Sequence, residues 1–131
     1  RLSRARPVET RHREVIVTEG AIDALSAAAA GYRAVAVLSA TYGDAAVATS
    51  LAKLPHPLVI AFDADEAGRA GAHRLASLLE ARQRPPVVID LERGDLNDTM
   101  RRANNWPDQM ARTVAHAMQH NGVPAGVSVS R

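Results

Sequence analysis

Acidic residues follow two short apolar runs of the sequence. Glu19 comes directly after residues 14–18 (EVIVT), and Asp63 and Asp65 come after residues 57–62 (PLVIAF). Two carboxylates about 4 Å apart repel each other by roughly 4 kcal/mol at an effective dielectric constant of about 20, so a protein that gathers several of them usually holds a cation there. Hard cations such as Mg²⁺ take oxygen ligands and need only one or two carboxylates, with water or phosphate completing the shell. The residue types therefore predict a divalent-cation site.

These carboxylates converge if the apolar runs are parallel strands, because the carboxyl ends of parallel strands lie at one edge of a sheet. Short apolar runs alternate with longer helical patterns along the chain, which is typical of βαβ units and a parallel sheet. None of the runs alternates cleanly between apolar and polar residues, as expected for strands covered on both faces. The predicted strands are residues 14–18, 34–38, 58–62 and 87–91, and the predicted helices are residues 21–30, 44–54, 66–84, 99–104 and 107–120.

Length and composition limit the class of protein. A chain of 131 residues is expected to form one domain with a single modest core. Apolar residues make up 47% of the chain but aromatic residues only 3%, so the core must be aliphatic. The absence of Cys excludes disulfides and Cys-based zinc sites. No run approaches the roughly 18 apolar residues of a membrane span and no signal-peptide pattern opens the chain, which predicts a cytoplasmic protein without a membrane partner.

Charge is distributed unevenly along the chain. The formal net charge is only +2, so the chain as a whole is not strongly attracted to nucleic acid. Five arginines crowd residues 1–13, with Glu9 the only acid among them. Such an arm can contact phosphates, but a linker remnant from a longer protein would have the same composition and is the interpretation we favour. We therefore divide the chain into an arginine-rich arm or linker remnant at 1–13, a domain carrying the acidic residues at 14–105, and a C-terminal helix and tail at 106–131.

A third acidic segment follows the fourth predicted strand, and the three segments together resemble the motifs of a known family. They read Glu19-Gly20-Ala-Ile-Asp23, Asp63-Ala-Asp65-Glu-Ala-Gly68-Arg69 and Asp95-Leu-Asn-Asp98. In this order and spacing they are similar to the motifs of Toprim domains, the catalytic modules shared by primases, topoisomerases and several nucleases. The primase-type version of bacterial, phage and plasmid primases is the most similar, over residues 14–102. The resemblance implies an α/β, Rossmann-like three-layer Toprim fold with a central, mainly parallel four-stranded sheet flanked by helices.

The resemblance also implies roles for individual residues. Glu19, Asp63 and Asp65 would be catalytic. The residues that would bind one or two Mg²⁺ or Mn²⁺ ions are Glu19, Asp63, Asp65, Asp95 and Asp98. Glu19 would be either a general acid/base or a further metal ligand, and the sequence leaves both roles open. The residues that would support the site without performing chemistry are Gly20, Asp23, Gly68 and Arg69.

Each acidic residue also has an ordinary structural explanation. Glu19 could be an acid at the start of a helix, where the macrodipole favours negative charge. Asp65 is a natural N-cap for the helix that follows it, although a cap accounts for only one of the two aspartates in its motif. Asp23 could be a solvated helix residue. Asp95 and Asp98 lie in a turn-like segment, where aspartate is common for local reasons.

The function that the resemblance implies is metal-dependent nucleotidyl transfer on nucleic acid, by the Toprim core of a DNA primase-like protein that is a fragment of a larger chain. Its partners would be a single-stranded DNA or RNA template, nucleoside triphosphates, and a helicase or other replication domain in the parent chain. Two alternatives stay open: a small Toprim nuclease that cleaves DNA or RNA, and a non-catalytic Toprim module that binds nucleic acid or a partner protein. Bacterial replicative primases carry a basic subdomain and usually a Cys-rich zinc module before this core, and neither is present in these 131 residues.

Overall fold

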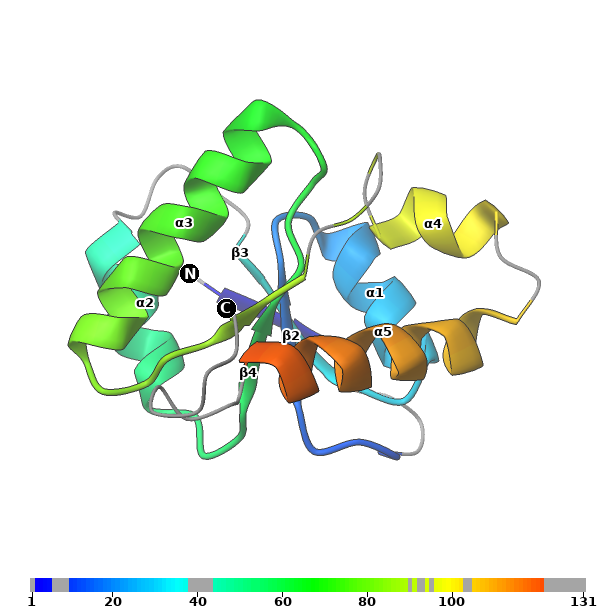
Figure 1. The fold of residues 1–131 in the computed structure, drawn as a ribbon, viewed down its shortest axis with the longest axis horizontal. Helices are drawn as coiled ribbons and strands as arrows, with labels where there is room; N and C mark the ends of the chain where they lie inside the picture. Colours follow the sequence, from blue (N-terminus) through cyan, green and yellow to red (C-terminus); the bar gives the residue numbers. More distant parts are fainter. Residues whose placement is uncertain are drawn as a thin grey trace.

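The computed structural model describes residues 2–5, 10–37, 44–89, 91, 94, 96–102 and 105–121. In this part of the chain, strands and helices alternate along the sequence to give an α/β fold (Figure 1). The strands are β1 (Leu2–Ala5), β2 (Val15–Thr18), β3 (Arg33–Val37), β4 (Leu58–Ile60) and β5 (Val87–Val88). The helices are α1 (Ala21–Ala29), α2 (Asp44–Ala52), α3 (Glu66–Ala81), α4 (Leu96–Arg102) and α5 (Trp106–Asn121).

The sheet has the strand order β1-β3-β2-β4-β5, in which β2 to β5 run parallel. These four strands lie where the sequence predicted them, and their parallel arrangement confirms the predicted sheet. β2 lies in the middle, where Val17 pairs with Val35 of β3 on one side and with Ile60 of β4 on the other. The carboxyl ends of β2 and β4 are therefore neighbours. Glu19 directly follows the first of these ends, and Asp63 follows the second after two residues.

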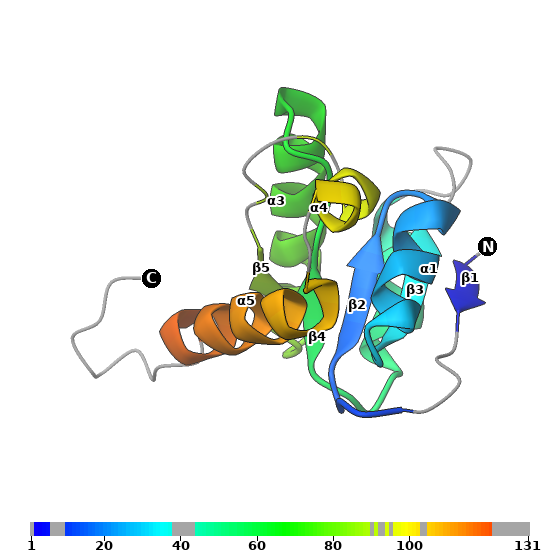
Figure 2. The same ribbon diagram turned by 90° about the vertical axis from the view of Figure 1, so that its right-hand side faces the viewer.

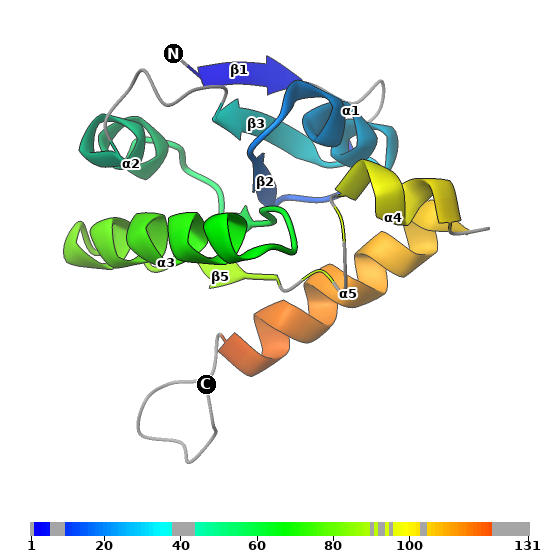
Figure 3. The ribbon, with the colours of Figure 1, turned by 90° about the horizontal axis from the view of Figure 1, so that it is seen from above.

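Helices cover both faces of the sheet. Figure 3 shows α2 and α3 on one side of it and α1, α4 and α5 on the other. Successive strand residues point to opposite faces, so each face has its own aliphatic core. The α2–α3 face buries Val15, Val17, Val35, Ile60, Leu51, Leu75 and Leu79, and the opposite face buries Ile16, Ala34, Val59, Met110 and Val114. Burial on both faces explains why the apolar runs show no polar alternation.

β1 is a strand that the sequence analysis missed. It pairs antiparallel with β3, with Leu2 opposite Val37 and Ala5 opposite Ala34, and it forms one edge of the sheet. We expected residues 1–13 to be an arm or a linker remnant because they are rich in arginine. An edge strand has only one hydrogen-bonded neighbour, and charged side chains are common on exposed edges. An arginine-rich composition is therefore compatible with a strand at this position.

The helices begin close to their predicted starts, with one exception. α4 begins at Leu96, three residues before the predicted Thr99, because the Asn97 N–H at its start is bound by the Asp23 side chain of α1. This partner lies 74 positions away in the sequence, so no local pattern reveals it. α4 and α5 lie beside α1 on their face of the sheet (Figure 2). No helix within the described ranges has the length and apolar composition that crossing a membrane requires.

Candidate active site

The Glu19 side chain joins the ends of two neighbouring strands. Its Oε1 atom accepts a hydrogen bond from the backbone N–H of Asp63 at 2.9 Å. Since Glu19 follows β2 and Asp63 follows β4, two residues that are 44 positions apart in the sequence meet at the carboxyl edge of the sheet. Both residues are half-buried. The first two acidic segments therefore lie against each other, and the glutamate itself makes the contact.

The turn that carries Glu19 is held by backbone and hydroxyl groups. Gly20 is the N-cap residue of α1, and its carbonyl oxygen accepts a hydrogen bond from the Ala24 N–H at 3.2 Å. The buried Thr18 hydroxyl donates to the same oxygen at 2.9 Å. A Cβ added to Gly20 would meet Asp23 Oδ2 at 3.7 Å, which is an ordinary contact. The Gly20 carbonyl group thus holds the turn that carries Glu19, and the space around Gly20 does not demand glycine.

Asp65 is the N-cap of α3. A cap was one of the two roles predicted for this residue, and binding a metal ion was the other. Its Oδ1 atom accepts a hydrogen bond from the Gly68 N–H at 2.6 Å. Gly68 in turn packs directly on the backbone of Asp63, and a Cβ added to Gly68 would overlap the Asp63 carbonyl oxygen. Glycine is therefore required at position 68 for the close approach between the first turn of α3 and the end of β4. The cap occupies one oxygen of the Asp65 carboxylate.

The third acidic segment is attached to the second by a backbone hydrogen bond. The N–H of Ala64, the middle residue of the Asp-x-Asp motif, donates to the carbonyl oxygen of Gly94 at 2.8 Å. Gly94 has a φ of 70°, a left-handed conformation that glycine adopts readily, and the Asp98 side chain lies against it. Asp98 is half-buried in the first turn of α4. Asp95, the other aspartate predicted as a metal ligand in this segment, lies outside the described residues.

Asp23 is buried and connects α1 to α4. Its side chain is only 5% exposed, and its Oδ1 atom accepts a hydrogen bond from the Asn97 N–H at 2.9 Å. Ser26, on the same helix, has its hydroxyl oxygen 3.3 Å from Asn97 Oδ1 and accepts the Trp106 indole N–H on its carbonyl oxygen at 3.1 Å. Asp23 is therefore no solvated surface residue. It holds the start of the helix on which Asp98 lies.

Sequence reasoning missed three residues that hold these helices together: Ser26, Asn97 and Trp106. Asn97 is part of the third motif, but only the aspartates on either side of it received a role. The single tryptophan of the chain was a usable signal, because a buried indole N–H nearly always needs an acceptor. Ser26 gives no signal in the sequence, since its carbonyl group makes the contact with the indole.

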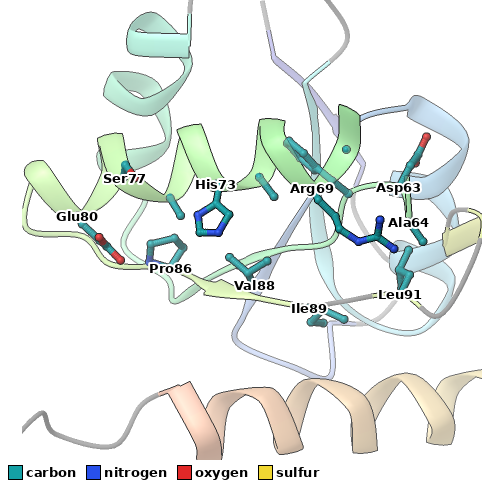
Figure 4. Close-up of a pocket in the computed structure, with 14 residues that line it drawn as sticks. Asp63, Ala64, Arg69, His73, Ser77, Glu80, Pro86, Val88, Ile89 and Leu91 are labelled. Atoms are coloured by element: carbon teal, nitrogen blue, oxygen red, sulfur yellow. The ribbon is translucent and has the colours of Figure 1, made fainter. Parts of the chain in front are cut away.

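A groove opens beside the Asp-x-Asp motif, between α3 and β5 (Figure 4). Its volume is about 660 Å³. Asp63 and Arg69 lie at one end of the groove, and Ser77 and Glu80 lie at the other. The exposed Arg69 side chain extends along the wall toward Leu91. The groove thus brings a guanidinium group to the carboxylate end of the site and leaves room for an extended ligand.

The carboxylates of this edge fit a hard divalent cation by their donor chemistry. Within the part of the chain that the structure describes, no three or more His, Asp or Glu side chains form a group that could hold a metal ion. Of the five predicted ligands, the four that are described therefore do not form such a group. Mg²⁺, however, usually keeps several waters and binds one or two carboxylates. Glu19 and Asp63, at adjoining strand ends, are compatible with that kind of site.

Residues 16–100 match the model of the Toprim-like family. This match covers more than half of the chain and includes all three acidic segments. The chain therefore belongs to the Toprim-like family, as its motifs predicted. A comparison with curated proteins gave no match.

Solved primase structures share this fold. The zinc-binding and RNA polymerase domains of the Aquifex aeolicus primase are 21% identical with a TM-score of 0.68, over 80% of this chain and 26% of that one. The primase fragment of the bacteriophage T7 primase-helicase protein is 26% identical with a TM-score of 0.61, over 78% of this chain and 44% of that one. A structure of the T7 lagging-strand DNA polymerase with primase domains bound to an RNA/DNA hybrid and dTTP matches at 23% identity and a TM-score of 0.54, over 82% and 54%. This chain thus spans from about a quarter to about a half of the length of the three chains that it matches.

Proposed function

We propose that this domain catalyses metal-dependent nucleotidyl transfer as the Toprim core of a primase-like protein. The observation that carries the proposal is the hydrogen bond from the Asp63 N–H to Glu19, which joins two acidic motifs of a Toprim-like chain at one sheet edge. Primase structures among its structural neighbours support the same activity. A domain with a purely structural role would gain nothing from gathering half-buried carboxylates, because their mutual repulsion lowers stability.

Glu19, Asp63 and Asp65 are the residues that would hold Mg²⁺ or Mn²⁺, with Asp98 and Asp95 as further candidates from the third motif. A divalent ion supplies neutralisation of the charge that develops on the attacking and leaving oxygens of an in-line phosphoryl transfer. Hydrogen bonds fix the orientation of two of these carboxylates. Glu19 Oε1 accepts a hydrogen bond from the Asp63 N–H, and Asp65 Oδ1 accepts one from the Gly68 N–H. Their second oxygens are the atoms that we assign to the ion.

Glu19 keeps two proposed roles, as a ligand or as a general acid/base, and both use the same Oε2 atom. Its half-buried position and its bond to a backbone N–H fix the side chain, which either role requires. A role in proton transfer would lower the rate of Glu19→Gln even when the metal concentration is saturating. A ligand role would instead raise the metal concentration needed for half-maximal activity in Glu19→Gln.

Arg69 is proposed to orient phosphate oxygens. It lies in the first turn of α3, is exposed, and shares the end of the groove with Asp63. A guanidinium group binds two phosphate oxygens at once, which fixes their geometry as well as their charge. The N-terminus of α3 adds a partial positive charge at the same end. The groove would then receive the nucleotide or the strand end that reacts at the carboxylates.

The partners that we propose are a single-stranded DNA or RNA template, nucleoside triphosphates, and a helicase or other replication domain in the parent chain. The T7 neighbour, whose matched fragment belongs to a primase-helicase protein, supports the last of these. The chain spans 26% to 54% of the primase-containing chains that it matches, so template binding by the whole protein is part of the proposal.

One assay tests this proposal against its alternatives. The chain is incubated with Mg²⁺ or Mn²⁺, a single-stranded template and labelled nucleotides, and in parallel with labelled nucleic acid alone. Products longer than the input, absent with Glu19→Gln, support synthesis. Shortened nucleic acid that also depends on Glu19 identifies a nuclease and overturns the primase assignment. If neither product forms, even when the parent chain is supplied, the result favours a non-catalytic binding module.

A further inference from the structure

Cationic side chains gather at the sheet edge opposite to the carboxylates. The segments that lead into the parallel strands β2, β3, β4 and β5 meet at this amino edge. The cationic or titratable side chains described in and beside these segments are Arg11, His12, Arg13, Arg33, Lys53, His56 and Arg84, together with one carboxylate, Glu14. Cationic side chains therefore outnumber the one described carboxylate at the beginnings of the strands, whereas the acidic motifs lie at their ends.

A pocket of about 330 Å³ lies at this amino edge, between the β1–β3 pair and the loop from α2 to β4. Its described polar side chains are Arg4, Thr10, Arg33 and His56, and none of its described lining residues is acidic. The rest of its described wall is apolar. A concave site with cationic groups and no described acid favours an anion, because its walls shield the charges less than open solvent does.

The register of the sheet places two arginines on one face of it. Arg4 lies opposite Val35 in the β1–β3 pair, and Arg33 lies two residues before Val35 on β3. Both side chains therefore point to the same face as Val35. Such diagonal neighbours lie about 7–8 Å apart, and their Cβ atoms are somewhat closer, within reach of one shared ligand. In the described part of the chain, neither guanidinium group forms a hydrogen bond or an ion pair.

Arg84 holds the opposite wall of the pocket in place. Its Nη1 atom donates to the carbonyl oxygens of Ala52 at 2.8 Å and Leu54 at 2.5 Å, and its Nη2 atom donates to that of His56 at 2.7 Å. One guanidinium group thus fixes the loop on which His56 lies, without lining the pocket itself. The wall is preorganised, so a ligand would not have to order it on binding.

We propose that this pocket binds phosphate groups of a single-stranded nucleic-acid backbone, at a site separate from the carboxylate edge. Two guanidinium forks match the several oxygens of a phosphate better than the two oxygens of a carboxylate. The Thr10 hydroxyl and the His56 imidazole add donors that carry no negative charge. The site does not depend on the proposed nucleotidyl transfer, because its described residues lie at the edge of the sheet opposite to the acidic motifs. A free phosphate ion has the same chemistry, so the test must separate the two sources.

The first experiment measures binding of a labelled oligo-dT strand by fluorescence anisotropy in EDTA, which excludes metal-dependent binding at the carboxylates. The double variant Arg4→Gln/Arg33→Gln is expected to bind about tenfold more weakly, and its salt dependence should be shallower by about 1.4, since each single-strand phosphate contact contributes about 0.7 to the slope. Arg112→Gln removes an exposed arginine from α5, on the other face of the sheet, and should bind as the original chain does. An unchanged affinity and slope in the double variant overturns the proposal.

The second experiment needs no variant, so its outcome does not depend on whether Arg33→Gln folds. The amide resonances of Arg33, Val35 and His56 are followed by NMR while oligo-dT or inorganic phosphate is added to the original chain. Shifts of these resonances at lower concentrations of oligo-dT than of phosphate support the proposal. Shifts with phosphate alone, or with neither ligand, overturn it. The same titration on Glu19→Gln should be unchanged, so a failure of the proposed catalytic function leaves this result standing.

Discussion

Gly68 lies so close to Asp63 that one added methyl group would occupy the space of the Asp63 carbonyl oxygen. This contact presses the first turn of α3 onto the segment that leaves β4. The Asp65 cap holds the same turn through the Gly68 N–H. The position of the Asp-x-Asp motif thus depends on a residue that has no side chain, three positions beyond it.

Gly68→Ala is expected to destabilise the domain by about 1–3 kcal/mol or more, because the backbone of Asp63 must move to admit the methyl group. Gly71→Ala is a matched control three residues further along α3. Its Cβ would lie 3.6 Å from the Phe62 ring, an ordinary contact, so alanine should stabilise the helix by about 0.5–1 kcal/mol. Urea unfolding followed by circular dichroism measures both changes. Equal stability of the two variants would contradict the close approach at position 68.

Glu19→Gln and Asp63→Asn should each lower metal-dependent activity on the order of 100-fold or more while the domain stays folded. The glutamine amide keeps an oxygen that can accept the Asp63 N–H, so the loss is one of charge rather than of structure. Glu66→Gln, at an exposed acid in the first turn of α3, is the control and should retain its activity. Full activity in both site variants would refute the catalytic assignment.

Mg²⁺ should stabilise the original chain and not the Glu19→Gln/Asp63→Asn variant. An ion that binds only the folded state adds about 2.7 kcal/mol at a concentration of about 100 times its dissociation constant. Thermal melting with increasing Mg²⁺, and again after EDTA, measures this effect without any assay of activity. A melting temperature that rises equally in the variant would place the ion elsewhere.

Asp23→Ala is expected to cost about 1–3 kcal/mol, because it leaves the N–H of Asn97 without its acceptor at the start of α4. Asp23→Asn keeps an acceptor oxygen at the same place and should cost less. Amide hydrogen exchange at Asn97 reports the bond directly and should be faster in the alanine variant than in the asparagine variant. If both variants exchange at the original rate, the side chain of Asp23 does not hold α4.

Tyr32 should make stability fall at alkaline pH. Burial, together with the negative charge of Glu14, raises the pKa of Tyr32 above its ordinary value of 10.0. The unfolded chain therefore loses the phenolic proton first, so stability is complete below about pH 10 and falls as pH rises above it, by up to about 1.4 kcal/mol per pH unit. Urea unfolding across this range should show a smaller decline for Tyr32→Phe. Parallel declines would mean that Tyr32 does not contribute.

The parallel sheet and the first two acidic segments were predictable because both leave local patterns. Each strand is a continuous apolar run, and Glu19 and Asp63 stand close behind two of them. The pairing of β1 with β3 was not predictable, since an edge strand needs no apolar pattern. The links from Asp23 to Asn97 and from Ser26 to Trp106 were also hidden, because a backbone group on a distant helix leaves no trace in the sequence. Binding of a divalent metal ion by the five predicted carboxylate ligands stays a prediction.

The hydrogen bonds that build the carboxyl edge join residues 44, 74 and 80 positions apart, from Glu19 to Asp63, from Asp23 to Asn97 and from Ser26 to Trp106. Contacts of such separation form slowly, because the chain between them must close before they contribute. During translation, residues 19–26 are synthesised well before Asp63, Asn97 and Trp106, with which they form these hydrogen bonds. All three hydrogen bonds can therefore be present only after Trp106 has left the ribosome, and a chain terminated before that residue would lack the one that ties α5 to α1.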